Sequence, residues 1–141
     1  MPCRYTLHPD IGILHCRFSG HLHLDDILGF VDRALRDPGH RDGTNILADA
    51  RALTRLDIDG PAQRRLSDRL VALERWRGMP RSCAIIAAGE PVWSLVGSIV
   101  ATTSLESPVV FDRFRNPSGA LAFVGLNPRL HSDRFGYLPV P

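Results

Sequence analysis

The chain has 141 residues, and its hydrophobic (44%) and charged (23%) fractions are those of an ordinary globular domain. These values exclude a disordered or fibrous chain. The formal net charge is +2 and all 17 basic residues are arginine, so no strong field is available to attract nucleic acid or an anionic membrane.

The N-terminus and the cysteines indicate a cytoplasmic protein. Residues 1–10 contain too few apolar residues for the core of an export signal. No apolar run reaches the roughly 20 residues that a membrane span needs. Cys3, Cys16 and Cys83 are odd in number and include no C-x-x-C pair, which argues against a zinc knuckle and a thioredoxin-type site. Free thiols of this kind fit a reducing cytoplasm.

The first third of the chain predicts a hairpin, a helix and a strand. Residues 4–8 and 13–18 alternate in polarity around the turn sequence Pro9-Asp10-Ile11-Gly12, as in a β-hairpin. From residue 24 onward the apolar residues recur at helical spacing, until Asp37-Pro38-Gly39 ends the helix. Residues 44–50 then have the composition of a short strand.

The middle of the chain predicts two helices around a buried strand. A second helix begins at a cap formed by Asp57 or Asp59 and ends at Gly78-Met79-Pro80. Residues 82–88 are apolar on both faces, which is typical of a central strand that is covered on both sides. Glu90-Pro91 begins the third helix.

The last strand, residues 109–114, precedes a short helix that Asn116-Pro117 caps. Residues 127–141 have no periodicity and contain three prolines, which predicts a tail without regular structure. We therefore expect one α/β domain over residues 1–126 and a Pro-containing C-terminal tail. The order of elements predicts a mixed, mostly parallel sheet, in which an N-terminal β-hairpin is followed by right-handed βα units.

Several local sequences, taken in this order, resemble a known family. They are Phe18-Ser19-Gly20, Leu24-Asp25-Asp26 and residues 45–49, 57–60 and 120–123. Together they resemble the STAS domain, the fold of bacterial anti-sigma-factor antagonists, over about residues 4–126. The resemblance implies a STAS-like sheet and a bacterial regulatory role exercised through a protein partner.

One turn of this sequence departs from the family pattern. In the family, an Asp precedes two hydroxyl residues and a Gly, and a partner kinase phosphorylates the first hydroxyl. Here the turn is Leu56-Asp57-Ile58-Asp59-Gly60, so the acceptor position falls on Ile58 and no hydroxyl is present. The sequence thus predicts a domain without the phospho-switch. Asp59 either imitates a permanent phosphate charge or caps the following helix.

The carboxyl ends of the parallel strands form the expected functional edge, because ligands usually bind at this end of a parallel sheet. The loops 19–23, 51–60, 89–93 and 116–119 meet there. Besides Arg51, the candidate binding residues on this edge are His21, His23, Arg55, Asp57, Asp59, Glu90 and Trp93. The alternative is that these residues are solvated caps and polar loop groups.

Metal binding and catalysis are not expected. His21-x-His23, with Asp25 and Asp26 nearby, could contribute two imidazoles, but a third ligand has to be guessed, such as Asp49 or Glu90. Alternatively, His23 simply begins the helix, with Asp26 reaching back to its backbone N–H. No nucleophile elbow and no phosphate-binding loop is present, so we expect neither an enzyme nor a cofactor.

Two further surfaces have alternative interpretations. The second helix carries Arg64, Arg65, Arg69, Arg75 and Arg77, which form either a solvated, partly ion-paired face or a contact for an acidic partner or RNA phosphates. On the third helix, Trp93 and Gly97 form either a notch for a partner or ligand, or ordinary packing at the margin of the core.

We interpret the chain as a non-enzymatic cytoplasmic interaction or regulatory module that binds a protein partner, with a homodimer as one possible assembly. The alternative is a small apolar-ligand-binding domain that uses the third helix and the edge of the sheet as a pocket. The third hypothesis is an enzyme or metal protein built on the histidine-rich edge. An interaction module should have a flat apolar patch, and a ligand-binding domain should have an enclosed pocket. An enzyme should have converging titratable groups.

Overall fold

The computed structural model describes residues 2–77, 82–105, 107 and 109–138. Its first two strands, β1 (Cys3–His8) and β2 (Ile13–His23), pair antiparallel with Cys3 opposite Phe18 and His8 opposite Ile13. The predicted N-terminal hairpin is therefore confirmed. Gly12 has a φ of 64°, a conformation that glycine adopts without a steric penalty and that closes the turn.

The described strands form one mixed sheet in the order β1-β2-β3-β4-β5. The remaining strands, β3 (Asn45–Asp57), β4 (Ser82–Ile86) and β5 (Val110–Phe114), pair parallel with their neighbours, and β3 is parallel to β2. This arrangement confirms the predicted fold class. Residues 82–88 were expected to form the central strand. They contain β4, which lies between β3 and β5, and the middle strand of the sheet is β3.

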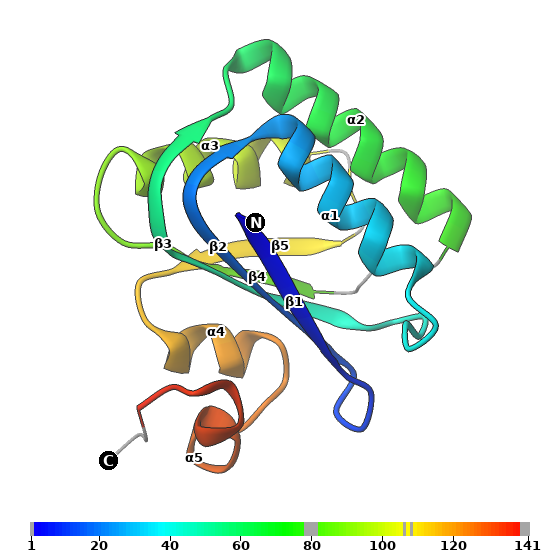
Figure 1. Cartoon of the computed structure of the whole chain (residues 1–141), viewed down its shortest axis with the longest axis vertical. Helices are drawn as coiled ribbons and strands as arrows, with labels where there is room; N and C mark the ends of the chain where they lie inside the picture. Colours follow the sequence, from blue (N-terminus) through cyan, green and yellow to red (C-terminus); the bar gives the residue numbers. More distant parts are fainter. Residues whose placement is uncertain (1, 78–81, 106, 108, 139–141) are drawn as a thin grey trace.

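The helices cover the sheet on both faces (Figure 1). On one face lie α1 (Leu24–Arg36), α2 (Gly60–Arg77) and α3 (Val92–Ser104); on the other lie α4 (Pro117–Phe123) and α5 (Pro128–His131). None of the described helices is long and apolar enough to cross a membrane.

Two hydrophobic cores result from the alternation of side chains along the strands. On β4, Ile85 packs with the core beneath α1–α3, whereas Ala84 and Ile86 belong to the core beneath α4. A strand that is covered on both faces should bury both of its isoleucines. Ile86 is indeed fully buried, but Ile85 keeps partial exposure. The reason is that Ile85 lies beside a cavity.

The strands β2 and β3 are longer than predicted, and residues 19–23 and 51–57 belong to strands instead of loops. Their parallel register shifts twice, between Arg17 and Ser19 and between Gly20 and His21, and at each shift β3 contains one more residue than β2. Such bulges bend a strand pair. We call residues 19–23 and 52–57 the β2–β3 extension; it curves toward α1 and α2 (Figure 1).

The described part of the C-terminal segment has regular structure, contrary to the prediction. Residues 127–138 contain α5 and a 3-10 helix, η1 (Ser132–Phe135), and Asn127 caps α5 by accepting a hydrogen bond from Arg129 N. Phe135 and Tyr137 are buried in the second core. The Arg17 side chain donates to Phe135 O at 2.7 Å, and His15 Nε2 shares a 2.9 Å hydrogen bond with the Tyr137 hydroxyl. The segment is ordered because its aromatic rings cover the face of β1 and β2 that α1–α3 leave open.

Candidate functional site

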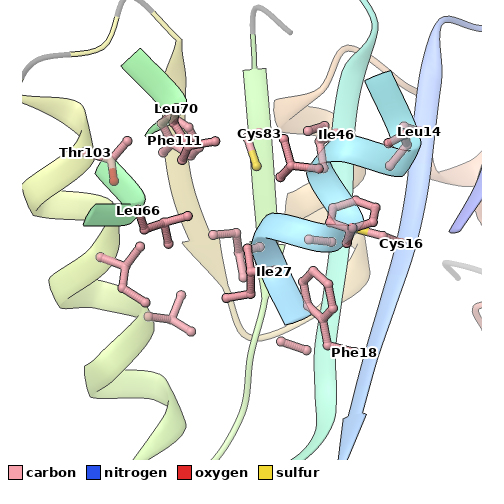
Figure 2. Close-up of a pocket in the computed structure, with 18 of the residues that line it drawn as sticks. Leu14, Cys16, Phe18, Ile27, Ile46, Leu66, Leu70, Cys83, Thr103 and Phe111 are labelled. Carbon is pink, nitrogen blue, oxygen red and sulfur yellow. The ribbon is translucent and has the colours of Figure 1, made fainter. Parts of the chain in front are cut away.

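An apolar cavity of about 140 Å³ lies between the sheet and the helices α1, α2 and α3 (Figure 2). The sheet forms its floor with Leu14, Cys16 and Phe18 of β2 and with residues of β3, β4 and β5. The helices contribute the opposite wall. The helical side chains labelled in Figure 2 are Ile27 of α1, Leu66 and Leu70 of α2, and Thr103 of α3.

Small side chains at the floor leave this space open. Cys16, Ala48 and Ala50 point from β2 and β3 into the cavity, where larger side chains would fill it, and Ala34 of α1 lines it as well. A close-packed interior has few voids larger than a water molecule, so a cavity of this size is unusual. The structure therefore holds a ready space for a compact apolar group.

The chemistry of the lining is almost entirely nonpolar. Among the described lining residues, the polar side chains are His40, Thr44 and Thr103, and the Thr44 hydroxyl donates to Arg41 O at 2.6 Å. Burial raises the pKa of Cys83 to about 12 and that of Cys16 well above its ordinary value. Both thiols stay protonated at neutral pH and are therefore poor nucleophiles. Such a lining selects a ligand by its shape and apolar surface.

Four of the predicted site residues come together on the outer face of the β2–β3 extension. His21 Nε2 donates a short hydrogen bond to Asp57 Oδ2, and His23 Nδ1 lies 3.8 Å from the same oxygen. Arg55 Nε donates to the other carboxylate oxygen at 2.9 Å. The hydrogen bond from His21, together with Arg55, lowers the pKa of Asp57 below its ordinary value. The third candidate metal ligand beside the two histidines is therefore Asp57, and not Asp49 or Glu90.

The other candidate acids have separate positions. Asp59 Oδ1 accepts a hydrogen bond from Ala62 N at 2.9 Å, which confirms the interpretation of Asp59 as a helix cap. Asp26 Oδ2 likewise accepts from His23 N at 2.9 Å at the start of α1. Glu90 is exposed beside α3. Ile58, at the position of the family's phosphoacceptor, is 3% exposed and packs in the core.

Trp93 and Arg51 also lie apart from the histidines. The guanidinium groups of Arg113 and Arg115 each lie 4.0 Å from the Trp93 ring centroid. A Cβ built on Gly97 would lie 2.5 Å from the Arg113 side chain, so the predicted notch is occupied by Arg113. Arg51 pairs with Asp49, and its guanidinium lies 5.3 Å from the Tyr137 ring centroid. The predicted edge is therefore divided into separate local clusters.

The arginine face of α2 is partly ion-paired. Arg64 contacts Asp68 within the helix, and Arg69 contacts Asp32 of α1. These pairs support the interpretation of the face as a solvated one. The side chains of Arg75 and Arg77 lie outside the described residues.

Comparisons with known proteins identify the fold. A solved structure of an uncharacterized protein from the DUF3478 family of Shewanella loihica PV-4, described as having a SpoIIAA-like fold, aligns with a TM-score of 0.53 and 18% sequence identity. The alignment covers 86% of this chain and 91% of that chain. No family model and no curated protein matches. The chain therefore has the SpoIIAA-like, STAS-type fold that the sequence predicted.

Proposed function

We propose that this chain is a non-enzymatic binding domain that takes a small apolar ligand between its sheet and the helices α1–α3. The observation that carries the proposal is the cavity of about 140 Å³ with its nonpolar lining. A buried apolar cavity of about 150 Å³ in another protein stays dry and accepts benzene. The space is smaller than the roughly 300–1,000 Å³ of sites for drug-sized molecules, so the ligand is a compact ring or a short aliphatic chain.

The chemistry of the cavity supports a binding role and not catalysis. Its thiols are held protonated, and His40 is the one imidazole among the described residues that line the otherwise apolar wall. We further propose that the domain is regulatory. We also propose that it acts in a reducing cytoplasm, and the three buried free cysteines support this choice of compartment.

Benzene serves as the test ligand in a thermal-denaturation experiment. A ligand that binds the folded state raises the melting temperature according to its free concentration relative to Kd. We expect benzene to raise the melting temperature of the wild-type chain. Ala48→Leu, which places a larger side chain in the cavity, should reduce that shift.

The neighbouring alanine provides the matched control. Ala48 and Ala84 are both buried and lie on adjacent strands, but Ala84 faces α4 instead of the cavity. Ala84→Leu should cost about 1–3 kcal/mol of unfolding free energy, because a packed core has no room for added carbons. Ala48→Leu should cost less than that. Equal costs, together with a benzene shift that is the same in Ala48→Leu and the wild type, would contradict the proposal.

A protein partner is the second candidate, and Trp93 favours it. The half-buried Trp93 ring is stacked with Arg113 and with the exposed Arg115. Tryptophan and arginine are the residue types most enriched among binding hot spots. An acidic segment of a partner would suit this surface.

Co-purification followed by native mass spectrometry tests this candidate, and it also reports any homodimer. Arg115→Glu should weaken a captured protein complex by charge reversal, whereas Arg129→Glu, on exposed α5, should not. A complex equally sensitive to both changes would point to general charge attraction instead of a site at Trp93.

A further inference from the structure

The outer face of the β2–β3 extension gathers three groups that commonly bind transition metals. His21 and His23 are two residues apart on β2, so their side chains project from the same face, while Leu22 between them is 1% exposed and lines the cavity. Across the parallel pair, His23 lies opposite Asp57 of β3. The sheet register therefore holds the two imidazoles and the carboxylate side by side.

The distances among these groups suit a shared ion. The candidate ligand atoms of His21, His23 and Asp57 all lie within 4.8 Å of one another, and the two imidazole centroids are 4.1 Å apart. Ligand atoms about 2.1 Å from a tetrahedral metal lie roughly 3.4 Å from one another. Small side-chain rotations would close the triangle, with His21 giving up its hydrogen bond to Asp57.

We propose that His21, His23 and Asp57 bind a divalent first-row transition-metal ion, with water in the remaining coordination positions. Two imidazoles and one carboxylate favour Zn²⁺, Co²⁺, Ni²⁺ or Cu²⁺ over Mg²⁺ and Ca²⁺, which prefer oxygen ligands. The side chains of His21, His23 and Asp57 are 42%, 55% and 35% exposed, so an ion from solution reaches them without a change of fold.

Arg55 gives the site a feature that a plain surface ion pair would not have. It donates to Asp57 Oδ1, whereas both histidines face Oδ2. Because Arg55 occupies Oδ1, Asp57 Oδ2 is the oxygen that faces the proposed metal position. The positive charge of Arg55 repels a metal cation bound there. Loss of that charge should make metal binding tighter.

Isothermal titration of the tag-free chain with Zn²⁺ tests the proposal. We expect saturable binding of one ion at micromolar concentrations, and no comparable binding of Mg²⁺. His21→Ala, His23→Ala and Asp57→Asn should each weaken binding by at least about tenfold. His131→Ala is the matched control, because it removes an imidazole outside the cluster and should leave the affinity unchanged.

Arg55→Gln should change the Zn²⁺ affinity in the opposite direction from the three ligand variants, because it removes a positive charge beside the site. Exposed ion pairs contribute little, so the expected gain in Zn²⁺ affinity is about 2–5-fold. Melting temperatures in the absence of metal show that each variant is folded. The proposal is overturned if the folded wild-type chain shows no saturable Zn²⁺ binding up to millimolar concentration. It is also overturned if the three ligand variants bind Zn²⁺ as tightly as His131→Ala does.

Discussion

His15 of β2 is a buried titratable side chain. It is 6% exposed, shares a hydrogen bond with Tyr137 and contacts the Phe135 ring edge-on, with the centroids 5.0 Å apart. Burial, with a further contribution from Arg17, lowers the pKa of His15 from 6.5 to about 4, although Asp49 acts in the opposite direction. His15 is therefore neutral in the folded protein at neutral pH.

This environment predicts a loss of stability in mild acid. Because the folded pKa of His15 is below its unfolded value, the unfolded chain binds the proton more tightly between pH 6.5 and about 4. The free energy of unfolding should be at its full value above pH 6.5 and should fall through this window by at most about 3 kcal/mol. Chemical denaturation at a series of pH values measures the slope.

A variant separates His15 from other groups that titrate nearby. The pKa of His8 is also lowered, first by burial and then by Arg134, so His8 contributes in the same direction. His15→Gln keeps a polar partner for Tyr137 but does not titrate, and it should flatten the slope between pH 4 and 6.5. An unchanged slope in His15→Gln would assign the effect to His8 or to groups elsewhere.

At the scale of elements, the C-terminal segment is an integral layer of the fold. Phe135 is 2% exposed and lies between the rings of His8 and His15, with a centroid distance of 5.0 Å to each. We expect Phe135→Ala to lower the unfolding free energy by about 3–5 kcal/mol, because truncation of a buried aromatic ring leaves a cavity. Urea denaturation gives this value directly.

The same segment contains its own control. Leu138 is 90% exposed, so Leu138→Ala should change the unfolding free energy by no more than about 0.5 kcal/mol. If Phe135→Ala were as mild as Leu138→Ala, the segment would not be part of the cooperative fold.

A local signal for this segment is present in the sequence. Asn127-Pro128 repeats the arrangement of Asn116-Pro117, and in both pairs the Asn caps a helix whose first turn contains the Pro. The first pair correctly predicted α4. The second was missed because α5 has four residues, too few for an apolar periodicity to appear.

The length of β3 was missed for a different physical reason. The residues of β3 that line the cavity are Ile46, Ala48, Ala50, Leu53 and Leu56, so their spacing changes from two to three after Ala50. A regular strand has a period of two, so the alternation that predicts a strand ends at Ala50. The two register shifts restore the alternation in space, but they depend on pairing with β2, which local sequence does not encode.

At the scale of the whole molecule, the order of elements was predictable and the candidate site only in part. Local periodicity and turn residues indicate β1–β5 and α1–α4, and the rule that parallel strands need crossover connections then defines the sheet. The contact of His21 and His23 with Asp57 could not be predicted, because it depends on the register between β2 and β3. The cavity could not be predicted, because it depends on how closely three helices approach the sheet.

The central claim is that an apolar ligand occupies the space between the sheet and α1–α3. The most direct measurement is a crystal structure of the chain under xenon pressure, because xenon enters dry apolar cavities. We predict xenon density within the cavity beside Cys16, Leu66 and Ile99. Xenon found exclusively at other positions, with the helices closed onto the strands and the cavity filled by side chains, would contradict the account.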